Sequence, residues 1–118
     1  MLIDLSINSQ YKKEKLGKVT LPGAFEEEHD LALVHRMADG DDSALHELYA
    51  EYGNRLFSYA IRLIGDPDQA EDVVQDALIV VWKTAARFRG EGRVLAWLLG
   101  IVHHLSMKSL RHASQPIT

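Results

Sequence analysis

Residues 66–88, DPDQAEDVVQDALIVVWKTAARF, contain the pattern that decides the fold. Asp66 can accept a hydrogen bond from a first-turn amide, and Pro67 suits the first position of a helix, where no amide hydrogen is needed. The apolar residues that follow recur every three or four positions and share one helix face: Ala70, Val73, Val74, Ala77, Val81, Ala85 and Phe88. The stretch therefore predicts an amphipathic helix packed against a core.

The flanking sequence predicts three more helices, and no segment shows the two-residue alternation of a strand. We expect a short helix over residues 30–38, a second that is capped by Asp42 or Ser43 and ends at Gly65, and a last one over residues 93–111. The apolar stripe of the second helix comprises Leu45, Leu48, Tyr49, Tyr52, Leu56, Ala60 and Leu63, and that of the last comprises Leu98, Ile101, Val102 and Leu105. The predicted fold is all-α, a compact bundle of about four helices.

The length and composition fit one small globular domain. The 118 residues are 47% hydrophobic and 25% charged, which is typical of a domain with a single core. Residues 1–28 show no sustained period, so we expect them to form a loosely ordered N-terminal arm. Residues 29–113 are expected to form the helical domain, and residues 114–118 to begin a linker or tail.

Several protein classes are disfavoured by features that the sequence lacks. No apolar run approaches the ~20 residues that a membrane span requires, and the start, Met1 to Asp4, lacks the basic region of a signal peptide. The chain has no cysteine, which excludes disulfides, thiolate catalysis and cysteine-type zinc sites. A cytoplasmic protein without membrane insertion is the simplest expectation.

The charge is unevenly distributed along the chain. The net charge is −4, but residues 26–86 hold 14 acidic and 4 basic side chains, whereas residues 87–118 hold 5 basic side chains and 1 acidic one. Such asymmetry suits one face for a basic or polar protein and another for an anion. Charge alone favours an ordinary solvated surface, so motifs must decide between these interpretations.

Three motifs follow one another along the predicted helices. The first is DSALHELY at residues 42–49 with LFSYA at 56–60, the second is AEDVVQDA at 70–77 with Trp82, and the third is Phe88-Arg89-Gly90 with WLLGI at 97–101. In this order, over about residues 29–112, they resemble region 2, the promoter-melting domain, of the extracytoplasmic-function (ECF) sigma factors of bacterial RNA polymerase. The second motif is the most specific, because it is similar to the Ala-Glu-Asp-x-x-Gln-Asp signature of that family.

The resemblance implies a transcription initiation factor domain that is not an enzyme and needs no cofactor. It implies docking on the clamp helices of the largest subunit of core RNA polymerase, and it allows for an anti-sigma factor as a further partner. The polymerase contacts would be Asp72, Gln75 and Asp76, with Ile79 beside them. The three polar residues share one helix face, and carboxylates suit arginines on a partner. The alternative is a solvated face, but exposed apolar groups such as Ile79 beside charges are commoner at interfaces.

The resemblance also implies capture of the non-template strand of the promoter −10 element, with one base turned out of the stack. The expected DNA-binding residues are Arg87, Arg89, Gly90, Arg93, Trp97, His104, Lys108 and Arg111. Guanidinium groups can pair with phosphates and stack on bases. Flipping a base costs on the order of a few kcal/mol, which a prebuilt pocket must offset. For each single residue on the last helix, the wet face of an amphipathic helix is the alternative.

Three features depart from the family pattern. Many members carry Arg-Asn where this chain has His103-His104, and many carry an acid where Lys108 stands. We expect His104 to alter the preferred promoter sequence, or to make DNA binding depend on pH in the range where histidine titrates. Members normally continue into a helix-turn-helix domain for the −35 element, whereas this sequence ends at Thr118. It is expected to be a fragment or to lack that domain.

Two other classes of function compete with this interpretation. A metal enzyme is disfavoured because His103 and His104 diverge by about 100° on a helix, and His46-Glu47 lacks the second histidine of a His-Glu-x-x-His motif. Stoichiometric metal in the purified protein would favour it. A helical interaction module without nucleic-acid binding explains the helices equally well, but not the positive charge around one loop and one helix. A titration with single-stranded DNA discriminates between this module, which should not bind the strand, and a sigma region 2 domain, which should bind it.

Overall fold

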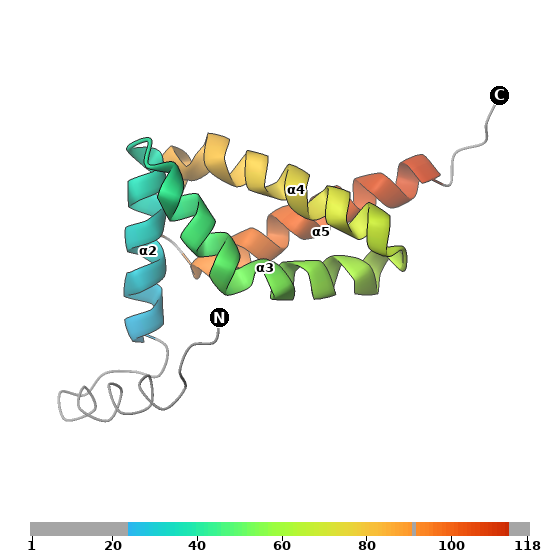
Figure 1. Ribbon diagram of the computed structural model, residues 1–118, viewed down its shortest axis with the longest axis horizontal. Helices are drawn as coiled ribbons and strands as arrows, with labels where there is room; N and C mark the ends of the chain where they lie inside the picture. Colours follow the sequence, from blue (N-terminus) through green and yellow to red (C-terminus); the bar gives the residue numbers. More distant parts are fainter. Residues whose placement is uncertain (1–23, 91, 114–118) are drawn as a thin grey trace.

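The computed structural model describes residues 24–90 and 92–113. They form four α-helices and a short 3-10 helix: α2 (Ala24–Ala38), α3 (Asp42–Ile64), α4 (Pro67–Thr84), η1 (Ala85–Arg87) and α5 (Val94–Ala113). Figure 1 shows α2 standing across one end of the molecule, while α3, α4 and α5 extend away from it alongside one another. No strand occurs in the described part of the chain, so the all-α prediction is confirmed. Residues 1–23 of the arm expected over residues 1–28, and the tail expected over residues 114–118, lie outside the described residues.

Local capping explains where α3 and α4 begin. The Asp41 carboxylate accepts a hydrogen bond from the Ser43 amide at 3.0 Å, so the cap of α3 lies one residue before the expected Asp42. Gly65 ends α3 in the left-handed conformation, with φ of 85°, where glycine has no Cβ to clash. Asp66 then caps α4 through the Asp68 amide at 3.0 Å, as predicted, with Pro67 at its first position.

The start of α2 differs from the expectation. The helix begins at Ala24, six residues before the expected start at residue 30, so the predicted end of the arm at residue 28 falls inside it. The sequence pattern missed this turn because it carries glutamates in place of an apolar stripe. Glutamate is a good helix former, and Glu27 contacts the amide of Val94 at the start of α5. A tertiary contact therefore accompanies helical residues that periodicity did not reveal.

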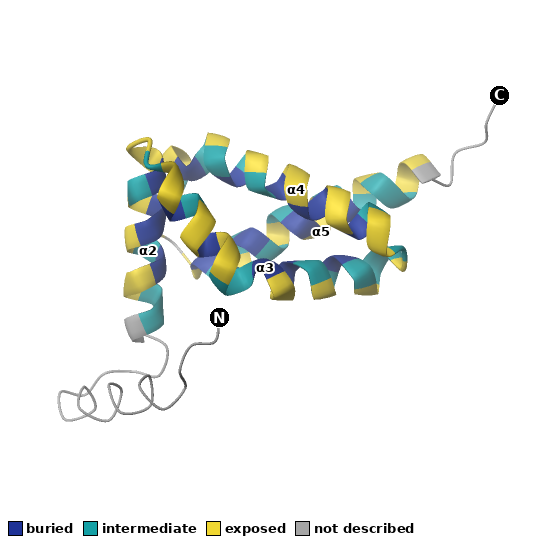
Figure 2. Cartoon of the chain, in the orientation of Figure 1, coloured by how far each residue is buried: buried dark blue, intermediate teal, exposed yellow. Residues whose placement is uncertain are grey.

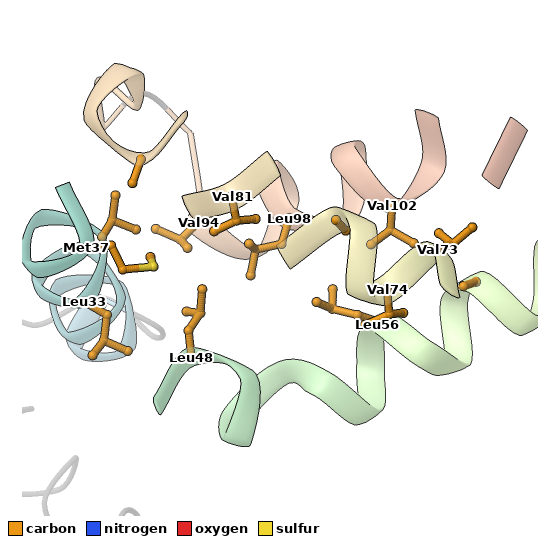
Figure 3. Packing of buried hydrophobic residues seen from close by; sticks show 14 of the residues in the cluster. Leu33, Met37, Leu48, Leu56, Val73, Val74, Val81, Val94, Leu98 and Val102 are labelled. Atoms are coloured by element: carbon orange, nitrogen blue, oxygen red, sulfur yellow. The ribbon is translucent and has the colours of Figure 1, made fainter. Parts of the chain in front are cut away.

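One apolar core joins all four helices. In Figure 3, Leu33 and Met37 of α2 point toward the same interior as labelled leucine and valine side chains of α3, α4 and α5. The predicted α4 stripe is buried from Ala70 to Ala85, whereas Phe88 is half-buried. Figure 2 shows the buried faces turned inward and the exposed faces outward on each helix. Within the described part of the chain, no helix has both the length and the apolar character that crossing a membrane would require.

Tyr49 does not belong to the core, contrary to the predicted stripe of α3. Its side chain is 48% exposed, and its ring covers Gly53 on the same helix, with Cε1 2.7 Å from where a Cβ on Gly53 would lie. The buried positions of this segment are Ala44, Leu48 and Gly53. The buried face of α3 therefore includes the small residues Ala44 and Gly53, which a search for large apolar side chains does not detect.

Candidate functional site

The residues expected to contact a protein partner share an exposed face of α4. Asp72, Gln75 and Asp76 are exposed, and Ile79 one turn further on is 52% exposed. We call these four residues the acidic ridge. The opposite side of α4 is buried against the bundle, which leaves the ridge open to solvent. Ile79 and Tyr49 are the large hydrophobic residues with exposed side chains among those described, so the ridge combines carboxylates with an apolar group.

The loop between α4 and α5 brings four of the expected DNA-binding residues together. A hollow of about 220 Å³ lies further along α5, but the one at the loop is larger, about 500 Å³. We call it the arginine hollow, and it is lined by Thr84, Arg87, Phe88, Arg89, Gly92, Arg93, Ala96 and Trp97. The rings of Phe88 and Trp97 pack with centroids 4.7 Å apart. Three guanidinium groups and two aromatic side chains therefore surround one concave surface.

Two glycines shape this loop. Gly90 and Gly92 both have φ of 78°, a conformation that costs other residues roughly 1–2 kcal/mol. Gly92 lines the arginine hollow, whereas the predicted site residue Gly90 does not. Gly90 faces α2 instead, because a Cβ placed on it would lie 3.9 Å from Cδ2 of Leu31.

The hollow continues as a groove between α4 and α5. A second hollow of about 360 Å³ shares Ala96 and Trp97 with the arginine hollow and is also lined by Val80, Gly100, Ile101, His104 and Leu105. The third, of about 220 Å³, shares Leu105 with the second and is also lined by Gln69, Asp72, Val73, Asp76, Lys108, Ser109 and His112. We call the three together the α4–α5 groove. Arg111 is exposed in the last turn of α5, beyond His104 and Lys108.

The acidic and cationic residues are less separated than the sequence suggests. Asp72 and Asp76 of the acidic ridge line the same hollow as Lys108. The sequence places them about 30 positions apart, but α4 and α5 pack alongside each other and bring them to one end of the groove. Lys108, which stands where many family members have an acid, thus lies among carboxylates, and the arginine hollow is the more purely cationic end.

The adjacent histidines of α5 face different neighbours, as helix geometry predicts. His103 shares a hydrogen bond with the hydroxyl of Tyr59 on α3, at 3.0 Å from Nδ1. His104 lines the groove on the α4 side. The divergence leaves His104, and not His103, facing a ligand in the middle of the groove.

One group of side chains in the described residues has the composition of a metal site. Single ligand atoms of His29, Asp30 and Glu51 lie within 4.8 Å of one another. Each already has a protein partner, because His29 pairs with Glu51 at 3.1 Å and Tyr52 donates a hydrogen bond to Asp30. Burial raises the pKa of the Asp30 carboxyl, an effect that the Tyr52 hydrogen bond opposes. These contacts account for the group as a junction between α2 and α3.

Glu27 is a residue that sequence reasoning missed. Its carboxylate lies 3.0 Å from the Val94 amide and 3.9 Å from Nε of Arg93. A run of glutamates such as residues 26–28 suits the start of a helix through the helix dipole. No local rule connects it to a residue 67 positions away.

Comparisons with known proteins agree with the fold. The family model described as Sigma-70 region 2 matches residues 48–115. RNA polymerase sigma-H factor of Pseudomonas aeruginosa is 29% identical over 97 residues, which cover 78% of this chain and 50% of that protein. ECF RNA polymerase sigma factor SigK of Mycobacterium tuberculosis is 31% identical over 81 residues, which cover 68% of this chain and 43% of that protein. The chain thus spans half or less of these curated relatives.

A solved structure is similar as well. It is the NMR structure of an engineered region 2 of sigmaE in complex with GTAAAA, and it matches with a TM-score of 0.65 and 28% sequence identity. The match covers 70% of this chain and 86% of that one. The arrangement of helices seen here is therefore that of a region 2 domain.

Proposed function

Because the chain belongs to the Sigma-70 region 2 family, as a region 2 domain of the ECF sigma type, we propose that it binds core RNA polymerase and captures the non-template strand of a promoter −10 element. The arginine hollow is the observation that carries the second half of this proposal. It gathers Arg87, Arg89, Arg93 and Trp97 around one concavity. A similar region 2 is in complex with GTAAAA, which supports a nucleic-acid strand as the occupant.

The chemistry of the hollow suits a single strand. Guanidinium groups pair with phosphates and stack on bases, and aromatic side chains add about 1–3 kcal/mol of stacking per base. The volume of about 500 Å³ lies within the ~300–1,000 Å³ of pockets that hold small ligands. In this proposal the hollow receives an extruded base, and the arginines hold the phosphates on either side of it.

The charges along the α4–α5 groove favour one path for the strand. The strand enters at the arginine hollow and passes Gly100 and His104, where the groove is mainly apolar. Asp72 and Asp76 at the far end repel phosphates, so the strand leaves the groove before reaching them. The same carboxylates stay available to arginines of a partner helix.

The acidic ridge is the proposed polymerase contact, on the clamp helices of the largest subunit. Asp72, Gln75 and Asp76 offer hydrogen-bond acceptors on one face, and Ile79 offers apolar area. Exposed charged groups contribute mainly to orientation and encounter, whereas a desolvated apolar group contributes to affinity. The proposed contact therefore combines both kinds of group.

A strand titration tests the DNA half of the proposal. Binding of a −10-like single strand should fall about twentyfold between 50 and 200 mM salt if roughly three phosphates are contacted, and core polymerase should strengthen it. Arg89→Ala should weaken binding, whereas Arg62→Ala, which removes an exposed arginine on α3 outside the hollow, should not. Absence of strand binding would favour a helical interaction module without nucleic-acid binding. Equal effects of the two substitutions would contradict the arginine hollow as the binding site.

A pull-down with core polymerase tests the other half. Asp76→Ala and Ile79→Ser should each reduce capture of the polymerase while leaving the melting temperature unchanged, because both side chains are exposed. Glu28→Ala is the matched control, since Glu28 is an exposed acid on α2 and not on α4. Normal polymerase binding by the double variant Gln75→Ala, Asp76→Ala would overturn the assignment of this face.

A further inference from the structure

The N-terminus of α5 depends on a side chain from another helix. α3 and α4 are capped by the residues directly before them, Asp41 and Asp66. Before Val94 stand Gly92 and Arg93, neither of which has a side chain that can accept a hydrogen bond. Arg93 occupies the cap position, because its carbonyl accepts the bond from the Trp97 amide at 3.1 Å.

Glu27 supplies the missing acceptor. Its two carboxylate oxygens lie 3.0 and 3.4 Å from the Val94 amide nitrogen. Val94 is 0% exposed, so water does not readily replace the carboxylate, and an unpaired buried amide is costly. The negative charge also stands at the positive end of the α5 dipole.

The same carboxylate holds Arg93. Oε1 of Glu27 lies 3.9 Å from Nε of Arg93, whose side chain remains 64% exposed and lines the arginine hollow. Three guanidinium groups and a helix N-terminus repel one another, and Glu27 is the acid at ion-pair distance from them among the described residues. Leu31, one turn along α2, meets the loop at Gly90. α2 therefore lies against the loop at two points, Leu31 near Gly90 and Glu27 at the start of α5.

From these contacts we propose that Glu27 is a positioning residue for strand capture. Acting from α2, it fixes the start of α5 and the position of the Arg93 guanidinium group. The loop is therefore already ordered for phosphate binding in the free protein. The inference rests on the proposed function of the arginine hollow. Its consequence is that the glutamate-rich start of α2 takes part in nucleic-acid binding without touching nucleic acid.

The test measures loop order and strand affinity separately in the full chain. In Glu27→Ala, hydrogen exchange at the Val94 amide should accelerate about ten- to a hundredfold, the equivalent of losing a buried hydrogen bond. Affinity for a −10-like strand should fall about tenfold, because the loop must then be ordered at the moment of binding. Glu27→Gln keeps an acceptor oxygen and should recover most of the Val94 protection.

Matched controls separate positioning from charge and from global stability. Glu28→Ala removes the neighbouring exposed glutamate and should leave both readouts unchanged. Val74→Ala, in the core between α3 and α4, should lower the melting temperature without changing strand affinity well below that temperature. If strand affinity falls equally in Val74→Ala and Glu27→Ala, the role of Glu27 is only structural and the inference is overturned.

The outcomes also distinguish this inference from the function on which it rests. If the unsubstituted chain binds no strand, the proposed function fails, while Val94 exchange still reports whether Glu27 holds the loop. Unchanged Val94 exchange in Glu27→Ala overturns the positioning role directly. If the chain binds the strand and Glu27→Ala binds it more tightly, the carboxylate competes with phosphate for Arg93, which also overturns the inference.

Discussion

The hydroxyl of Tyr52 donates a hydrogen bond to the carboxylate of Asp30, which is 3% exposed, and so joins α3 to α2. Desolvation raises the pKa of Asp30 and also that of Tyr52, for which the hydrogen bond to Asp30 adds to the effect. A buried acid with one hydroxyl donor holds the crosswise helix against the bundle. This hydrogen bond positions α2, the helix that carries Glu27. It therefore helps to hold Glu27 at the start of α5 as well as to stabilise the fold.

Replacing Tyr52 with phenylalanine should destabilise the domain. The substitution leaves the buried Asp30 carboxylate without its hydroxyl donor, which costs about 1–3 kcal/mol. Urea denaturation followed by circular dichroism measures the free energy of unfolding. Tyr59→Phe is the matched control, because its hydroxyl bonds an exposed histidine, and its loss should be smaller. Equal losses from the two substitutions would show that burial of Asp30 does not set the cost.

Replacing Asp30 with asparagine should change how stability depends on pH. Burial raises the pKa of Asp30 above 3.8, so the folded chain holds this proton more tightly than the unfolded chain. The resulting stabilisation is fully present below the unfolded pKa and is lost as pH rises through the raised folded pKa. Asparagine cannot ionise, so Asp30→Asn should become more stable relative to the unsubstituted chain as pH rises from about 3 to 7. Urea titrations across that range measure the difference between the two chains, and a difference that does not change with pH would contradict the raised pKa of Asp30.

The glycines at positions 92 and 100 should respond in opposite ways to alanine. Gly92→Ala should cost roughly 1–2 kcal/mol, because φ there is 78° and an L side chain resists it. Gly100 lies within α5 with no atom within 4 Å of an added Cβ, so alanine should stabilise by about 0.5–1 kcal/mol. Its methyl group would project at the α4–α5 groove beside Trp97 and His104. Weaker strand binding by a more stable Gly100→Ala would place the strand in that groove, whereas unchanged binding would exclude it from there.

Replacing each of the adjacent histidines of α5 in turn should show which of them affects the choice of strand and which only packs against α3. His104→Asn introduces the residue that many family members carry at this position, which lines the groove. The ranking of −10-like strands by affinity should therefore change. His103→Asn alters a side chain bonded to Tyr59 on the α3 side, and the ranking should stay the same. Competition binding with a panel of strands measures both. A changed ranking in His103→Asn alone would assign selection to the α3 side.

The helices were predictable because their signals are local. The spacing of apolar residues from Ala70 to Ala85 and the pair Asp66-Pro67 act within one or two turns, and the structure follows them. Prediction failed where a local pattern was ambiguous. Tyr49 fitted the apolar stripe by spacing, but its ring packs on Gly53 of its own helix and stays half exposed. The first turns of α2 carry three successive glutamates and no repeating apolar pattern, so periodicity did not reveal a helix there.

The sequence alone determined the helical class, the caps of α4 and which residues carry charge, since each depends on neighbours within a few positions. Only the tertiary structure decided which of these residues meet. It placed Lys108 beside Asp72 and Asp76 in one groove, and Glu27 on the amide of Val94. Such encounters depend on the crossing of packed helices, a relation between segments that no residue spacing along the chain encodes.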